Sequence, residues 1–116
     1  MVIGDICGHS INWSMIEITR MRCKLILECN RKTTVNDPIF IFLNKITYEC
    51  FIKNANKLTI NECKLLKKRL NTTIKKWTTS KIKDQIKEFI NLLERCINNR
   101  KCLYVYHNNQ PLKLVV

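Results

Sequence analysis

Glycine and proline are scarce in this chain, which has two of each among its 116 residues. Sandwiches and barrels of antiparallel strands are punctuated by turns that need these residues, so their scarcity favours helices over a strand-and-turn architecture. Both glycines, Gly4 and Gly8, lie near the N-terminus and leave no place for a glycine-rich phosphate loop. The composition therefore predicts a helical protein without such a nucleotide site.

Residues for catalysis or metal binding are also few. The two histidines, His9 and His107, lie near opposite ends of the chain, and nothing in the sequence places either beside a cysteine that it could activate. Cys7 and His9 would make one pair of metal ligands but not a site. Structural zinc sites separate paired ligands by about two to four residues, and two cysteine pairs are spaced more widely: Cys23 with Cys29, and Cys96 with Cys102. We expect no enzyme activity, no metal and no cofactor.

Long hydrophobic runs are absent from the sequence. The most apolar stretch, Pro38 to Leu43, is far too short to cross a membrane, and we expect no membrane insertion. Residues Met1 to Ile6 have neither the basic segment nor the apolar run of a signal peptide. Three alternatives follow: a mature form with an initiator methionine, a truncated product, or a cytosolic protein.

Basic residues, by contrast, are abundant. There are 21 lysines and arginines against 9 aspartates and glutamates, which gives a formal net charge of +12. This balance favours an anionic partner such as nucleic acid, glycosaminoglycan or an acidic protein surface. The alternative is that the lysines only solvate helix faces, since no arginine-rich or glycine-aromatic recognition motif accompanies them.

Apolar residues recur at three- and four-residue spacing in four segments, as amphipathic helices require. The first segment extends from about Ser10, its expected N-cap, to Glu28. The second begins at Asp37-Pro38, an N-cap followed by proline at the first helical position. The start of this second helix, residues 39–42, would equally suit a strand.

The third segment opens with a capping box, in which the side chains of Thr59 and Glu62 can each bind a backbone amide. Ser80 is the expected N-cap of the fourth. Residues 102–106 are β-prone and suit either a short strand or an extended tail packed on the helices. A hydrophobic fraction of 46% suffices for a core. We therefore predict one domain over residues 1–116, an all-α four-helix bundle.

Seven cysteines are spread over the whole chain and lie near the ends of the expected helices. In a short protein this spread is typical of a disulfide framework formed in an oxidising compartment. Asn12 and Asn71 both match the N-glycosylation acceptor pattern. We expect a secreted, extracellular glycoprotein in which disulfides staple the bundle. The cysteines are Cys7, Cys23, Cys29, Cys50, Cys63, Cys96 and Cys102.

Three stretches follow a pattern of cysteines and helices known from one family. The polar connection Cys29-Asn30-Arg31-Lys32-Thr33-Thr34-Val35 leads to Tyr48-Glu49-Cys50, Cys50 and Cys63 each open a helical segment, and the last helix spans Ile82 to Arg95. In this pattern the chain resembles the short-chain four-helix cytokines, closest to the interleukin-4/interleukin-13 group. The resemblance covers most of the chain. It implies an up-up-down-down bundle with long crossover connections, secreted as a monomer, that acts in immune or growth-factor signalling by bridging cytokine receptor ectodomains.

The resemblance also implies a disulfide map. Its pairs are Cys29–Cys63 and, between the two ends of the chain, Cys7–Cys102 or Cys7–Cys96. Cys50 would then pair with Cys96 or Cys23, and one cysteine would be left over.

Receptor-binding residues follow from the resemblance as well. Members of the family hold their high-affinity receptor through an acidic residue on the first helix, here Glu17, and basic residues on the third, here Lys67, Lys68 and Arg69. Glu17 could instead pair with Arg20 or Arg22 on a solvated surface. The last helix would offer four residues to a second receptor chain: Lys87, Asn91, Arg95 and Asn98.

The competing hypothesis is an intracellular basic helical protein, of viral origin for example, that binds nucleic acid or an acidic protein partner. Its cysteines would stay reduced and serve as small buried hydrophobic residues.

Overall fold

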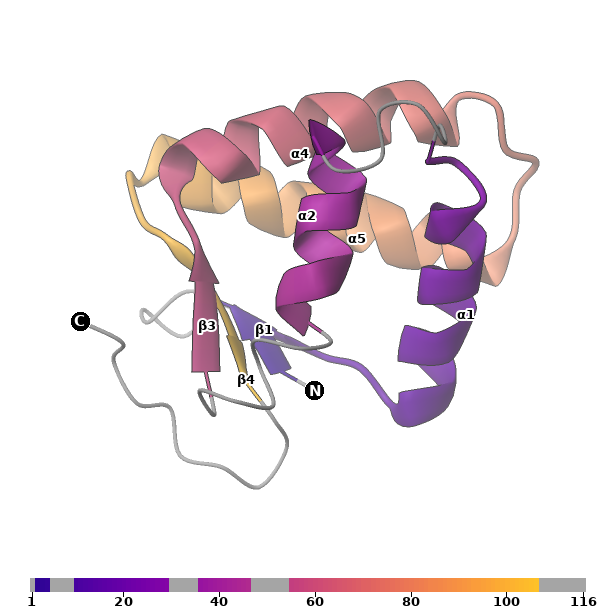
Figure 1. The fold of residues 1–116 in the computed structure, drawn as a ribbon, viewed down its shortest axis with the longest axis horizontal. Coiled ribbons are helices and arrows are strands. Elements are labelled where there is room, and N and C mark those ends of the chain that lie inside the picture. The colour runs from indigo at the N-terminus through magenta and orange to yellow at the C-terminus, as the bar shows by residue number, and fades with distance from the viewer. Residues whose placement is uncertain (1, 5–9, 30–35, 47–54, 107–116) are drawn as a thin grey trace.

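The computed structural model describes residues 2–4, 10–29, 36–46 and 55–106. In these residues the chain forms a mostly helical domain with four helices and one small sheet (Figure 1). The elements in chain order are β1 (Val2–Gly4), β2 (Ser10–Asn12), α1 (Met15–Ile26), α2 (Pro38–Asn44), β3 (Ala55–Leu58), α4 (Ile60–Ile74), α5 (Lys81–Asn98) and β4 (Leu103–Tyr106).

The sheet joins segments from the two ends of the chain. Its strand order is β2-β1-β4-β3, and every neighbouring pair is antiparallel. Ile3 lies opposite Val105 in the central pair, and Leu58 lies opposite Leu103. Because Ile11, Leu58, Leu103 and Val105 are buried, one side of the sheet forms part of the core. Figure 1 shows β3 leading into α4, and β4 following α5, so the sheet lies where α4 begins and α5 ends.

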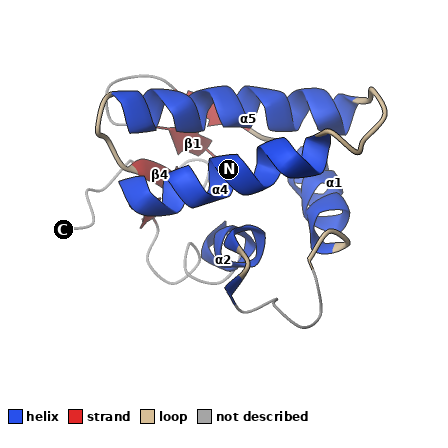
Figure 2. Ribbon diagram, turned by 90° about the horizontal axis from the view of Figure 1, so that it is seen from above, coloured by secondary structure: helices blue, strands red, loops and turns tan. Residues whose placement is uncertain are grey.

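Two long helices form the framework of the domain. α4 and α5 lie side by side and antiparallel, with the most extensive contact between any two elements (Figure 2). The same view shows α2 nearly end-on, so α2 crosses the long pair, and in Figure 1 α1 and α2 both run across α4 and α5. Phe89 of α5 connects these layers: its ring centroid lies 5.5 Å from that of Trp13 and 4.8 Å from that of Phe42.

The local signals for helix starts are largely confirmed. Asp37 accepts a hydrogen bond from the amide of Ile39 at 2.9 Å, with Pro38 at the first helical position. Thr59 and Glu62 form the predicted capping box of α4, and Ser80 caps α5. Each of these sites pairs a short polar side chain with a free amide of the first turn, which requires no distant partner. Such local chemistry explains why the sequence alone predicts them.

Two predictions about the architecture need correction. The domain is not all-α, because four strands accompany the four helices in the described residues. Of the two alternatives for residues 102–106, a strand or an extended tail, the structure has the strand, β4. The first helix begins at Met15, and its N-cap is Ser14, not Ser10, which lies in β2. Ser14 accepts a bond from the Glu17 amide at 3.2 Å while Glu17 accepts one from the Ser14 amide at 3.1 Å. This reciprocal pair gives Ser14 the advantage over Ser10 as the start of the helix.

The end of α5 offers a test of backbone strain. Arg100 has a φ of 53°, and the bonds from its amide to Ile97 and from Lys101 to Cys96 form a Schellman ending. Glycine tolerates this left-handed conformation without steric cost. Arg100→Gly is therefore expected to raise the free energy of unfolding by about 1 kcal/mol in urea titration. Asn98→Gly, inside the helix, should lower it by a similar amount, and stabilisation by both variants would contradict this explanation.

Candidate anion-binding face

A row of lysines lies along the outer face of α4. Lys64, Lys68 and Lys75 are all exposed, and their spacings of four and seven residues place them on one side of the helix. The opposite side carries Leu66 and Leu70, which are fully buried. At a rise of about 1.5 Å per residue, the row spans about 16 Å. We call Lys64, Lys68 and Lys75 the lysine row.

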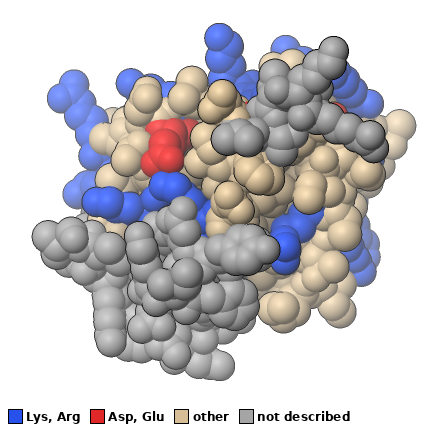
Figure 3. Space-filling model, viewed as in Figure 1, with Lys and Arg blue, Asp and Glu red and all other residues tan. Residues whose placement is uncertain are grey.

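Within the described part of the chain, no ion pair joins the lysine row to a carboxylate. Glu62 of α4 and Glu94 of α5 are engaged by other lysines. Glu62 binds Lys45 at 3.0 Å, and Glu94 binds Lys67 at 3.5 Å. The positive charge of the row is therefore not neutralised by ion pairs within the described residues. Figure 3 shows Lys and Arg side chains projecting from the edge of the molecule along which α4 runs in the same view.

The surface around the row is hollowed on two sides. A shallow groove of about 490 Å³ separates α4 from the end of α5, and a second hollow of about 590 Å³ lies toward α2. Lys68 and Thr72 line both, so they stand on the ridge between them. The exposed Asn61 and half-buried Asn71 add neutral side-chain amides beside the lysines. The face thus combines point charges with hydrogen-bond donors, which suits anionic oxygen groups.

Arg69 differs from its lysine neighbours because it is built into the fold. Its guanidinium binds Asp37 through Nε at 3.3 Å and Nη2 at 3.2 Å. Nη2 also donates to the carbonyl of Glu28 at 2.7 Å, and Nη1 donates to the hydroxyl of Thr73. The Asp37 side chain is only 6% exposed. Arg69 therefore links the end of α1 and the start of α2 to α4, and it is not available to a partner in this arrangement.

The other predicted receptor-binding residues are not brought together in one patch. Glu17 belongs to the capping box of α1, where the hydrogen bond from the Ser14 amide holds its pKa below the usual value. Lys67 is half-buried in its pair with Glu94. Of residues 67–69 only Lys68 is exposed, and it belongs to the lysine row. The set predicted for a second receptor chain lies exposed on α5: Lys87, Asn91, Arg95 and Asn98.

The α5 set shares its side of the helix with acidic residues. Asp84 and Glu88 are exposed, and their helical spacing places them beside Asn91 and Arg95. This face therefore carries mixed charge, in contrast to the lysine row. The resemblance singled out residues 67–69 as the basic residues of the third helix, and no binding role was predicted for Lys64 and Lys75. Helical periodicity could have found both, since they share a face with Lys68.

No disulfide forms among the five described cysteines. The pairing of Cys29 with Cys63, which the resemblance implied, is not present. Cys29 lies near Asp37 and Arg69. Cys63, near the start of α4, lies instead near Cys96 and Cys102. Pairings with Cys7 or Cys50 fall outside the described residues.

Among the described cysteines, Cys63 and Cys96 are buried, Cys29 and Cys102 are half-buried and Cys23 is exposed. Burial, reinforced by Cys96 and Cys102, raises the pKa of Cys63 to about 12, so this thiol stays protonated at neutral pH. Burial likewise raises the pKa of Cys29. In the ranges that the structure describes, no cluster of three or more His, Cys, Asp or Glu side chains could hold a metal ion. Asn12 is exposed in β2 and Asn71 is half-buried inside α4, so glycosylation of either stays a prediction.

None of the helices in the described segments combines the length and apolar character needed to span a membrane. Comparison of the chain with protein-family models, with curated proteins and with solved structures finds no match.

Proposed function

We propose that this protein binds the phosphate backbone of nucleic acid through the lysine row of α4. The observation that carries the proposal is the row itself: three exposed lysines on one helix face without a carboxylate partner among the described residues. Phosphate contacts in such complexes come from lysine and arginine charges and from neutral donors such as asparagine and threonine. Asn61, Asn71 and Thr72 supply that second kind of group.

The shape of the face supports nucleic acid over an acidic protein. Protein interfaces concentrate their binding energy in aromatic and arginine anchors that fill pockets. The lysine row instead borders a shallow groove lined mainly by lysine, asparagine and threonine. The hollow on its other side also contains Glu28, Pro38 and Leu65, and its Arg69 is committed to Asp37. Such a surface makes distributed electrostatic contacts, which are characteristic of backbone binding without sequence preference.

The test compares two variants with equal charge. Lys64→Gln/Lys68→Gln/Lys75→Gln removes the row, and Lys81→Gln/Lys87→Gln/Arg100→Gln removes three exposed charges from α5 and its end. Binding of a labelled 20-base-pair DNA is measured by fluorescence anisotropy at several salt concentrations. The α4 variant is expected to bind at least about tenfold more weakly, and the slope of log K against log salt should flatten by about 3 units, or 0.9 per lost phosphate contact.

The control variant should retain most of the affinity. Equal losses in both variants would show that only net charge matters and would contradict a site on α4. If the protein binds heparin but not DNA, and the α4 variant loses heparin binding, the face is a glycosaminoglycan site and the proposal is overturned.

A secreted receptor ligand is the second candidate function. The observation that favours it is the common exposed side of α5 shared by Lys87, Asn91, Arg95 and Asn98. The missing Cys29–Cys63 bond weakens it, because the resemblance implied that bond. Mass spectrometry with alkylation before and after reduction distinguishes the two functions. Seven alkylated cysteines in protein that is unfolded but not reduced would rule out the secreted ligand. Three disulfides would favour it over nucleic-acid binding.

A further inference from the structure

Helix α1 is apolar on two sides. Ile18, Met21 and Leu25 face the core and are at most 5% exposed. On the outside, four large apolar side chains are 57–81% exposed: Met15, Ile16, Ile26 and Leu27. Amphipathic surface helices normally turn charged residues outward, and a helix that is apolar all round is normally buried. The exposed apolar side chains at both ends of α1 therefore mark this side of the helix as a candidate interface.

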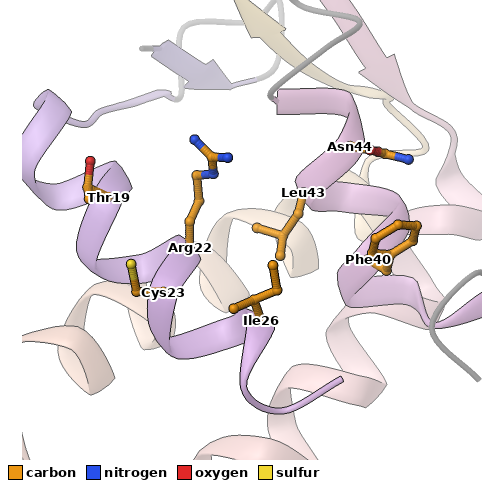
Figure 4. A pocket seen from close by; sticks show the side chains of 7 residues that line it. All are labelled: Thr19, Arg22, Cys23, Ile26, Phe40, Leu43 and Asn44. Carbon is orange, nitrogen blue, oxygen red and sulfur yellow. The ribbon is translucent and has the colours of Figure 1, made fainter. Parts of the chain in front are cut away.

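A groove continues this surface toward α2. It has a volume of about 530 Å³ and is lined by Thr19, Arg22, Cys23, Ile26, Phe40, Leu43 and Asn44. In Figure 4 the side chains of Ile26 and Leu43 point toward one another from the two helices, and Arg22 extends from α1 beside them. We call Met15, Ile16, Ile26 and Leu27 together with this groove the α1 surface.

The charges at its borders define the partner. Helical spacing places Arg20 and Arg22 on opposite sides of the exposed apolar strip. Neither forms an ion pair with another residue that the structure describes. Glu17, the one carboxylate of α1, is held in the capping box. A partner that covers the strip would therefore gain from carboxylates on both flanks.

The length of the strip excludes a small ligand and the charges disfavour self-association. The exposed apolar residues lie in two pairs, Met15 with Ile16 at the start of α1 and Ile26 with the C-cap Leu27 at its end, and Thr19 and Cys23 lie between the pairs. From first to last they extend over about 18 Å, the length of a partner helix of about twelve residues. A second copy of this chain packed face to face would bring Arg20 and Arg22 against the same residues of its partner. Like charges so placed oppose the contact.

We propose that the α1 surface binds an amphipathic helix of another protein, with an apolar strip flanked by aspartate or glutamate. Apolar residues at three- and four-residue spacing would fill the groove between α1 and α2 in the helix-in-groove mode. The carboxylates would pair with Arg20 and Arg22. This surface shares no residue with the lysine row, so the two proposals succeed or fail separately.

The test uses three 18-residue peptides as probes. The first is an amphipathic helix with a leucine strip flanked by glutamates, the second carries lysine in place of glutamate, and the third has the first composition in scrambled order. Binding is followed by anisotropy and by amide shifts in ¹⁵N NMR spectra of the full chain. We expect the first peptide alone to bind, with shifts confined to residues 15–27 and 38–44.

Two variants of the α1 surface and one control variant test the binding site further. Ile26→Asp should weaken binding at least tenfold, whereas Leu65→Asp, at an equally exposed leucine of α4, should leave it unchanged. The variant Arg20→Glu/Arg22→Glu should no longer bind the glutamate peptide and should bind the lysine peptide instead. A variant that had only unfolded would bind neither.

Three results would overturn the proposal. Equal binding of the scrambled peptide would show that charge alone acts. Shifts centred on Lys64, Lys68 and Lys75 would assign the peptide to the lysine row. A wild-type dimer that Ile26→Asp converts to a monomer would make a second copy of the chain the occupant.

Discussion

Replacing Arg69 with methionine is expected to lower the free energy of unfolding by about 2–4 kcal/mol, although this arginine lies in a run of basic residues on a surface helix. Removing one partner of a buried ion pair leaves the other charge without compensation, at a cost of about 3–5 kcal/mol. The Asp37 carboxylate is 6% exposed and would be left in that state, whereas the Arg69 side chain is 26% exposed and partly solvated. Partial solvation of the pair reduces the expected loss to the range given.

The comparison that isolates this effect is with Lys68→Met. Lys68 precedes Arg69 on the same helix but is exposed, so its loss should change stability by less than about 0.5 kcal/mol. A cycle with Asp37→Asn, read by urea denaturation, should show a coupling energy above 1 kcal/mol between the two positions. If Arg69→Met and Lys68→Met unfold at the same urea concentration, the ion pair contributes nothing and Arg69 returns to the set of available binding residues.

The starts of α2, α4 and α5 follow from the sequence because each is decided within four residues. The N-cap side chains of Asp37, Thr59 and Ser80 each accept a hydrogen bond from an amide of the first turn. The sheet could not be predicted in the same way. β1 and β2 have three residues each, too few for an alternating pattern, and β1 is paired with β4 from the other end of the chain.

Only part of the candidate face could be predicted from the sequence, for the same physical reason. Helical periodicity places Lys64, Lys68 and Lys75 on one side of α4 without knowledge of any other element. Which basic residues are free depends on partners far away in the sequence. Arg69 is bound by Asp37, 32 residues before it, and Lys67 by Glu94, 27 residues after it. The resemblance named residues 67–69 together as binding residues, although only Lys68 of the three remains available.

The largest loss of stability is expected for Phe89→Ala, about 3–5 kcal/mol. Phe89 is fully buried and meets Trp13, which precedes α1, in an edge-to-face contact with an interplanar angle of 84°. It also lies against Phe42 of α2. Truncation would remove both aromatic contacts and leave a cavity where α1 and α2 cross α5, which adds to the cost of lost burial.

The conservative variant Phe89→Leu keeps most of the volume and should lose less than about half as much in urea denaturation. Phe89 anchors the elements that carry the α1 surface. Phe89→Leu should therefore lower the affinity for the acidic peptide more than the affinity for DNA, whose proposed contacts are on α4. Equal losses for peptide and DNA would mean that Phe89 stabilises the domain as a whole and does not position α1 and α2 separately. A larger loss for the peptide would show that the aromatic cluster sets the geometry of one surface independently of the other.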